Sequence, residues 1–159
     1  MTTINLSQKE RMLLEDQKSH EEICIQKYTN YANQTQDPAL KQLFTTHAQQ
    51  EQHHYDTINQ ILSGTVPNMN QQGQQQNQQN KQNNMQAQGN VGMVNSNDAA
   101  LCSDLLMTEK FVSGAYDTAI FECRDTKLRD ALNHIQKEEQ KHGEEIFNYM
   151  QSHGMYNVK

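Results

Sequence analysis

The sequence feature that most constrains the fold is a short pattern, Glu-x-x-His, which occurs twice at an offset of 88 residues. In both copies another glutamate precedes the pattern by 30 residues. Residues three apart on a helix lie on the same face, so each copy points a carboxylate and an imidazole in one direction. Two helices with this pattern and two with one glutamate each supply the ligands of a di-iron or di-manganese carboxylate centre. The candidate metal ligands are Glu21, Glu51, His54, Glu109, Glu139 and His142.

The repeat extends beyond these six groups. When residues 13–62 are aligned with residues 101–150, identities fall at expected helix caps and core positions, as in the pairs Leu13/Leu101, Tyr28/Tyr116, Asp37/Asp125, Leu40/Leu128 and Ile58/Ile146. Two helical hairpins joined by a long crossover form the plan of a ferritin-like bundle. We therefore predict an all-α, ferritin-like four-helix bundle that is a single domain over residues 1–159. Its hairpins are expected at about 7–63 and about 98–153, with the long crossover between helices 2 and 3.

Local signals predict where the helices begin and end. Ser7 and Glu10 have the spacing of a capping box, and Asp37 followed by Pro38 is typical of an N-cap and first helical residue. No alternating run of β-branched residues predicts a strand. The remaining boundaries are expected at Gly64, Ser96–Asp98, Asp125 and Gly154.

The segment between the hairpins, residues 64–97, has a different composition. More than half of its residues are Asn or Gln, and it contains no Phe, Tyr, Leu or Ile. Such a segment buries too little apolar area to offset the entropy of ordering. We predict a disordered Gln/Asn-rich linker.

The six candidate ligands lie on the apolar line of their helices. Phe44 and Ile58 flank the first Glu-x-x-His pattern, and Ile135 and Ile146 flank the second. Four ionised carboxylates packed together are strongly unfavourable without compensation. Two divalent cations, iron or manganese, would balance them, so the sequence predicts a two-metal centre. The alternative is a degenerate site whose carboxylates are protonated, hydrated or paired with histidine.

Neighbouring residues have less specific signals. Tyr28 and Tyr116 each follow a candidate ligand by two helical turns, which suits either a hydrogen bond to a ligand or a place in the core. His47 is expected to face inward, beside the ligands. Glu138 and Glu145 fit an exposed charged face.

Composition excludes several classes of protein. The formal charge is -6 and no basic residues cluster, which argues against nucleic-acid binding. No apolar run approaches the roughly 20 residues of a membrane helix, and no secretory signal precedes residue 10, so synthesis in the cytoplasm is expected. The cysteines are odd in number and none forms a CxxC pattern, so we predict reduced, buried thiols at Cys24, Cys102 and Cys123.

The second half of the sequence also resembles a known family. The resemblance is carried by Leu-Leu-Met-Thr-Glu-Lys-Phe at 105–111, Ala-Tyr-Asp-Thr-Ala-Ile-Phe-Glu-Cys at 115–123, Leu-Arg-Asp-Ala-Leu at 128–132, Glu-Glu-Gln-Lys-His at 138–142, Ile-Phe-Asn-Tyr-Met at 146–150 and Gly-Met-Tyr at 154–156. These segments are similar to sequences of the spore coat protein F family of endospore-forming bacteria, whose members commonly end in Gly-Trp-Tyr. The resemblance implies a sporulation protein in or under the spore coat, with other coat proteins as partners.

Two functions follow as hypotheses. The first is a coat component on a ferritin-like scaffold that acts by assembly. It is expected to be a homo-oligomer that also contacts other coat proteins. The second is an oxidative-stress enzyme, catalase-like or peroxidase-like, or an iron-oxidising protein, in which two bridged metals react with peroxide or dioxygen. The sequence does not decide whether the chain is an enzyme.

Overall fold

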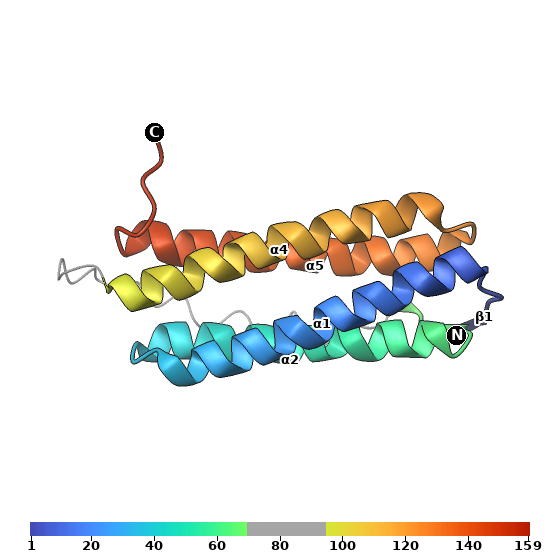
Figure 1. Cartoon of the computed structure of the whole chain (residues 1–159), viewed down its shortest axis with the longest axis horizontal. Helices are drawn as coiled ribbons and strands as arrows, with labels where there is room; N and C mark the ends of the chain where they lie inside the picture. The colour runs from blue at the N-terminus through green and yellow to red at the C-terminus, as the bar shows by residue number, and fades with distance from the viewer. Residues whose placement is uncertain (70–94) are drawn as a thin grey trace.

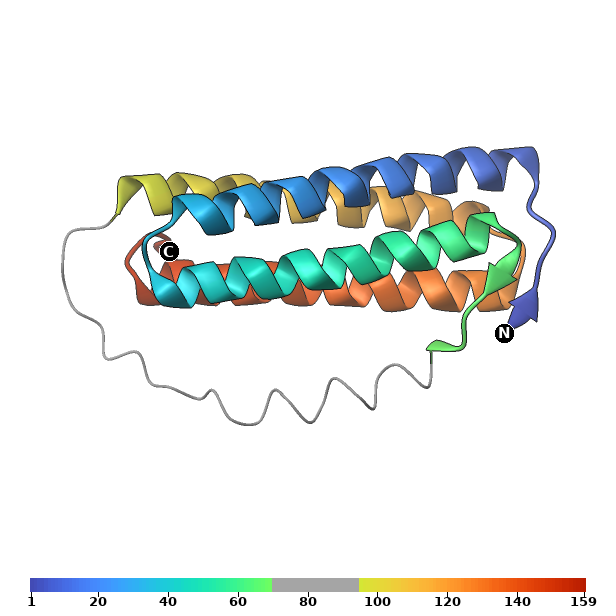
Figure 2. The same ribbon diagram turned by 90° about the horizontal axis from the view of Figure 1, so that it is seen from below.

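A computed structural model describes residues 1–69 and 95–159 of the chain. These residues form four long helices and one short pair of strands, arranged as an elongated bundle (Figures 1 and 2). The elements in chain order are β1 (Thr2–Thr3), α1 (Gln8–Gln34), α2 (Pro38–Leu62), β2 (Thr65–Val66), α4 (Ser96–Glu122) and α5 (Thr126–Ser152). The all-helical prediction is confirmed, and the four helices form two hairpins, α1–α2 and α4–α5.

The helix starts follow the predicted caps. The Ser7 hydroxyl accepts from the Glu10 amide while the Glu10 carboxylate accepts from the Ser7 amide, which is a complete capping box. Asp37 caps α2, whose first residue is Pro38. The helix boundaries repeat at the offset of 88 residues, because α4 and α5 begin and α4 ends that far after their counterparts in the first hairpin. The cap of α4 is Asn95, one residue before the predicted start.

Two glycines end helices in the left-handed conformation. Gly64 has φ 96° and Gly154 has φ 69°, values that cost a glycine little. After α5 the Met155 amide donates to the Met150 carbonyl at 2.8 Å and the Gly154 amide donates to Gln151, the two bonds of a Schellman motif. Both predicted stops are confirmed.

The short strand pair was not predicted. Thr2–Thr3 pairs with Thr65–Val66 in antiparallel register, and the Ile4 amide donates to the Gly64 carbonyl at 2.9 Å. Val66 is buried against the end of the bundle. The prediction of no strand is wrong here because a two-residue pairing needs no alternating pattern. The predicted disordered linker, 64–97, is too wide at both ends, and its central part lies outside the described residues.

The interior is divided along the bundle. One apolar cluster, which includes Leu14, Ile58 and Leu128, fills the end near the strands, and another, which includes Phe44 and Ile146, fills the opposite end. A layer of buried acids and histidines lies between them. The helices α1 and α4 pack together and join the two hairpins.

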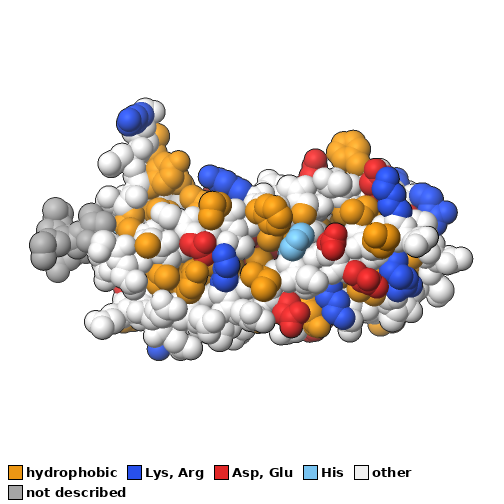
Figure 3. Space-filling model, viewed as in Figure 1, with side chains coloured by type: hydrophobic (Ala, Val, Ile, Leu, Met, Phe, Trp, Pro, Cys, Tyr) orange, Lys and Arg blue, Asp and Glu red, His pale blue; other side chains and the backbone are white. Residues whose placement is uncertain are grey.

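The outer surface is mixed. In the face seen in Figure 3, hydrophobic side chains gather on α4 and along its border with α1. On α1 and α4, three exposed apolar side chains line one hollow: Ile23, Met107 and Phe111 are 48%, 64% and 65% exposed. No helix in the described part of the chain is long and apolar enough to cross a membrane.

Candidate metal centre

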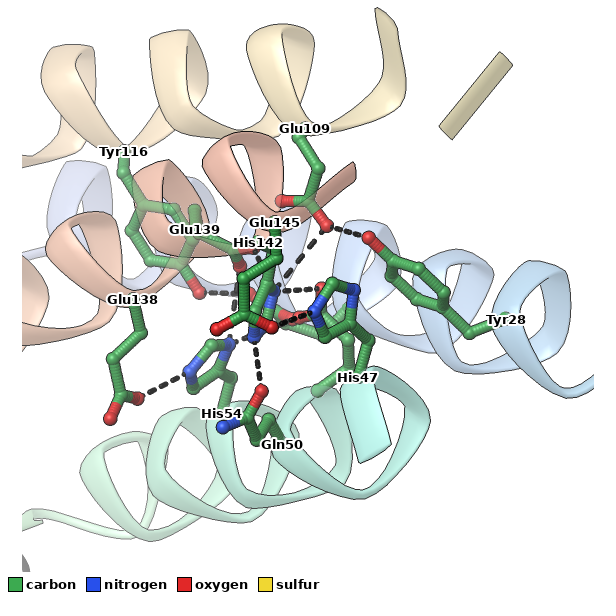
Figure 4. A network of polar contacts seen from close by, with 12 residues as sticks. Tyr28, His47, Gln50, His54, Glu109, Tyr116, Glu138, Glu139, His142 and Glu145 are labelled. Carbon is green, nitrogen blue, oxygen red and sulfur yellow. Dashed lines mark hydrogen bonds and ion pairs between the residues drawn. The ribbon is translucent and has the colours of Figure 1, made fainter. Parts of the chain in front are cut away.

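The structure brings all six candidate ligands together in the polar layer. Each helix contributes as the spacing indicated: one glutamate from α1, one from α4, and a Glu-x-x-His pair from each of α2 and α5. All are buried, with at most 3% of any residue exposed. Figure 4 shows several of these groups pointing toward one another from different helices.

The six groups form two overlapping sets of four. The first set is Glu21, Glu51, His54 and Glu139, and the second is Glu51, Glu109, Glu139 and His142. Within each set, one ligand atom from every residue lies within 4.8 Å of the others. Glu51 and Glu139 belong to both sets, so two carboxylates are shared and each set keeps one further glutamate and one histidine.

Both histidines face the shared carboxylates through the same ring nitrogen. His54 Nδ1 lies 3.0 Å from Glu51 Oε2 and 3.2 Å from Glu139 Oε1. His142 Nδ1 lies 3.2 Å from Glu51 Oε1 and 3.4 Å from Glu109 Oε1. The two Nδ1 atoms are therefore the ones available to a metal ion.

Two tyrosines hold the unshared glutamates across the hairpins. Tyr28 of α1 donates to Glu109 of α4, and Tyr116 of α4 donates to Glu21 of α1. Burial, together with the nearby carboxylates, raises the pKa of both phenols well above the ordinary value, so both remain protonated donors. Of the two roles that the sequence left open, each tyrosine has both: it is buried in the core and it bonds a candidate ligand.

The outer nitrogens of the two histidines have different partners. His54 Nε2 lies 2.7 Å from Glu138 Oε2, and His142 Nε2 lies 2.6 Å from Gln50 Oε1. Glu138 and Gln50 occupy corresponding positions, 88 residues apart, each directly before the glutamate of its pattern. The prediction that Glu138 belongs to an exposed face is wrong, because its side chain turns inward and is only 24% exposed. The position before the pattern was the signal that sequence reasoning missed.

A third histidine lies beside the second set. The His47 ring stacks on the His142 ring with centroids 4.3 Å apart, and His47 Nε2 lies 3.0 Å from Glu145 Oε2. His47 is fully buried, as predicted, and no described atom hydrogen-bonds its Nδ1. Burial lowers the pKa of His47 despite the nearby Glu145 carboxylate. Glu145 was predicted to lie on an exposed charged face, but its side chain is 33% exposed and lies against the buried His47 ring.

The cluster carries opposite charges side by side. Burial alone would lower the pKa of His54 and of His142, but the surrounding carboxylates outweigh it and raise both pKa values well above the ordinary one. Burial and the neighbouring carboxylates raise the pKa of Glu51, and they raise that of Glu109 to about 7. Without metal, protons on these groups offset the clustered negative charge, which is the arrangement of the alternative, degenerate site.

Three buried carboxylate oxygens in the centre have no hydrogen bond within the described part of the chain, although two of them lie within 4 Å of a histidine nitrogen. Among the described residues, no hydrogen bond reaches Oε2 of Glu21, Glu109 or Glu139, and all three atoms are buried. Buried polar atoms are nearly always bonded, and an unpaired one costs about 1–3 kcal/mol. Carboxylate oxygens and imidazole nitrogens are ligands for iron and manganese. The donors present therefore fit two divalent cations.

The comparison with known families bears on the second hairpin. Residues 97–159, which include nearly all of α4, α5 and the tail, match the model of the Coat F domain. This segment is a Coat F domain. The resemblance to the spore coat protein F family is thereby confirmed for this part of the chain, and the domain indicates a location in the spore coat. No curated protein and no solved structure matches the chain.

The Coat F domain contains only half of the candidate centre. Glu109, Glu139 and His142 lie within it, and the other three groups lie in the first hairpin. Each set of four includes residues from both hairpins. A complete set of ligands therefore requires the Coat F domain to pack against α1 and α2.

Proposed function

We propose that this protein is a spore coat component whose four-helix bundle carries a two-metal carboxylate centre of iron or manganese. Glu51 and Glu139 would be shared by both ions. Glu21 and His54 would complete one site, and Glu109 and His142 the other. The observation that carries the proposal is the pair of overlapping ligand sets with two carboxylates in common.

Charge balance supports the proposal. The two histidines hold protons in the metal-free cluster, and Glu51 and Glu109 retain protons to unusually high pH. Divalent cations can replace these protons and would also bond the three buried carboxylate oxygens that no hydrogen bond from a described residue reaches. The positive charge that the protons provide in the metal-free cluster would thus come from the two metal ions.

The protein's own groups would prepare the site. Tyr28 and Tyr116 fix the unshared glutamates, and Glu138 fixes the ring of His54 so that Nδ1 points inward. The apolar clusters on either side of the layer shield it along the bundle axis. When bound, two such metals supply redox chemistry with peroxide or dioxygen.

Elemental analysis of untagged protein tests the proposal. After reconstitution with ferrous or manganous salt and removal of free metal, we expect about two metal ions per chain, because a buried carboxylate site retains its metal. Fewer than about 0.2 ions per chain with either metal would contradict it. Glu51→Gln should lower the metal content and remove the metal-dependent rise in Tm, whereas Glu144→Gln, at an exposed position, should change neither.

One observation favours a catalase-like reaction as the second candidate function. The three cysteines of the chain are all buried and free, so they do not form a cysteine-bound iron site for electron delivery. Disproportionation of two hydrogen peroxide molecules to two waters and one dioxygen needs no external reductant. Metal-loaded protein that consumes peroxide and releases half as much dioxygen would support this candidate; peroxide loss without dioxygen would exclude it.

The exposed face of α1 and α4 supports self-association. Ile23, Met107 and Phe111 line a mainly apolar hollow there, with the His20 ring against Phe111 at 5.3 Å. We expect a homo-oligomer that contacts other coat proteins, and burial of such side chains would stabilise it. Analytical ultracentrifugation of the wild type and of Phe111→Lys tests this; a monomeric wild type would contradict it.

A further inference from the structure

A groove between α4 and α5 leads from the surface toward the candidate metal centre. Its volume is about 700 Å³, and its lining includes two of the six candidate ligands, Glu109 and Glu139. Leu106 and Phe147 contribute apolar walls. A molecule in this groove would lie beside two of the residues proposed to hold the metals.

Gly143 keeps the groove open. It follows the candidate ligand His142 in α5, and a Cβ atom placed on it would lie 3.7 Å from Leu106 Cδ1 on α4. A side chain longer than that of alanine would therefore extend over the groove. Glycine inside a helix is less stable than alanine, so helix formation alone does not account for this residue.

The first hairpin fills the corresponding position. The residue 88 positions before Gly143 is Tyr55, and the counterpart of Leu106 is Lys18. Lys18 Nζ lies 5.3 Å from the centroid of the Tyr55 ring and donates to Asn59 Oδ1 at 2.8 Å. These contacts join α1 to α2 over the positions that α4 and α5 leave open.

The exposure of the ligands follows the same difference. Glu109 of the second hairpin is 3% exposed, whereas its counterpart Glu21 is 0% exposed. Glu139, which also lines the groove, is 0% exposed. The groove therefore reaches the edge of the centre at Glu109, where only a small part of the residue is exposed.

We propose that the α4–α5 groove admits a small uncharged oxidant, hydrogen peroxide or dioxygen, to the two-metal centre, and that Gly143 keeps this route open. The inference rests on the proposed metal centre. The apolar walls disfavour ions, which lose hydration there. The groove lining outside the ligands includes one residue of each charge, Lys110 and Glu144, so it attracts neither anions nor cations strongly.

Nitric oxide, a small uncharged probe, tests the route without turnover. Wild type, Gly143→Leu and Gly114→Leu are loaded with ferrous iron without oxygen, the iron content is measured, and nitric oxide binding is followed by stopped-flow absorbance. We expect equal iron content but about tenfold slower binding in Gly143→Leu, because the side chain must first move aside. Gly114→Leu is the matched control, since no atom lies within 4 Å of a Cβ at that position.

A smaller substitution guards against loss of folding. If Gly143→Leu does not fold, Gly143→Val serves in its place, because its side chain is smaller than that of leucine and still longer than that of alanine, and binding slower than in the wild type is expected. Separate oxidation of the ferrous protein by dioxygen and by hydrogen peroxide then identifies the oxidant, which is the one that the substitution slows.

The outcomes separate the route from the centre. If the wild type holds iron and a folded Gly143 variant binds nitric oxide as fast as the wild type does, the proposed route is wrong and the proposed metal centre still stands. Slower uptake of iron with unchanged nitric oxide binding would also overturn the route, because the groove would then carry metal. A wild type that retains neither iron nor manganese would overturn both.

Discussion

The two hairpins have the same inner layer but different outer layers. Their helices begin at the same offset, and each supplies two carboxylates and one imidazole to the centre. Outside this layer, the partners of the two histidines differ. Glu138 of the second hairpin bonds His54, whereas its counterpart Gln50 of the first hairpin bonds His142. The groove residue Gly143 likewise corresponds to Tyr55.

This difference shows which positions the centre restricts. A metal pair would require a fixed number of donors from each hairpin, and the repeat holds at all six candidate ligands. The groups behind the ligands need only a hydrogen bond, which a carboxylate and an amide can both provide. The two proposed sites are therefore alike in ligands and unlike in basicity and access.

The most drastic way to break the comparison is to remove a shared ligand. Glu139 lies in the second hairpin but belongs to both ligand sets, so we expect Glu139→Ala to lose both metals. His54→Ala belongs to one set only and should leave about one metal per chain. Mass spectrometry under native conditions distinguishes the two cases, and retention of two metals by Glu139→Ala would contradict the shared role.

The partners of the histidines sharpen the comparison next. Glu138→Gln makes the two hairpins alike, and we expect metal affinity at the His54 site to fall about 10–100-fold, because a carboxylate partner raises the basicity of the ligand. Gln50→Glu should strengthen the His142 site in the same sense. Competition with a chelator measures both affinities, and equal affinities in Glu138→Gln and wild type would contradict the assignment.

A buried acid near each hairpin's start provides a third test. Glu10 accepts from the Arg124 amide at 2.8 Å and pairs with its guanidinium at 3.1 Å, whereas Oδ1 of its counterpart Asp98 has no hydrogen-bond partner among the described residues. Glu10→Gln should therefore destabilise the protein by about 1–3 kcal/mol, and Asp98→Asn by less. Urea denaturation of both variants measures the difference, and an equal loss would contradict it.

The same pair predicts the effect of acid. Burial would raise the pKa of Glu10, but its bonds to Arg124 and Ser7 outweigh burial and lower the pKa to about 2. Since the folded pKa is below the ordinary value of 4.5, the stabilisation is complete above that value and is lost as the pH falls toward 2. The wild type should thus lose more stability than Glu10→Gln between pH 5 and about 2. Parallel losses would contradict the shift.

The smallest effect concerns the glycines of the second hairpin. Gly143→Ala and Gly114→Ala should each raise stability by about 0.5–1 kcal/mol, because alanine favours the helix. The added Cβ meets Leu106 at an ordinary 3.7 Å in the first case and no atom within 4 Å in the second. Thermal denaturation measures both gains, and a loss at residue 143 would mean that the groove cannot accept even a methyl group.

The four helices and the inward direction of the six candidate ligands could be predicted from local sequence patterns. Caps such as Ser7 and Asp37 act within one turn, and the three-residue spacing of Glu and His fixes their common face on a helix. These are local relations, so they could be predicted without knowing how the hairpins pack. The offset of 88 residues then indicated that the two hairpins would supply matching groups.

Which of these groups contact one another depends on how the helices pack. Tyr28 and Glu109 are 81 residues apart in the chain, and His54 and Glu138 are 84 apart, so no local pattern pairs them. The sharing of Glu51 and Glu139, the open groove at Gly143 and the strand pair also depend on how distant segments pack. Side-chain orientation within a buried layer is set by neighbours from other helices, and that information lies in the packing, not in the spacing along one helix.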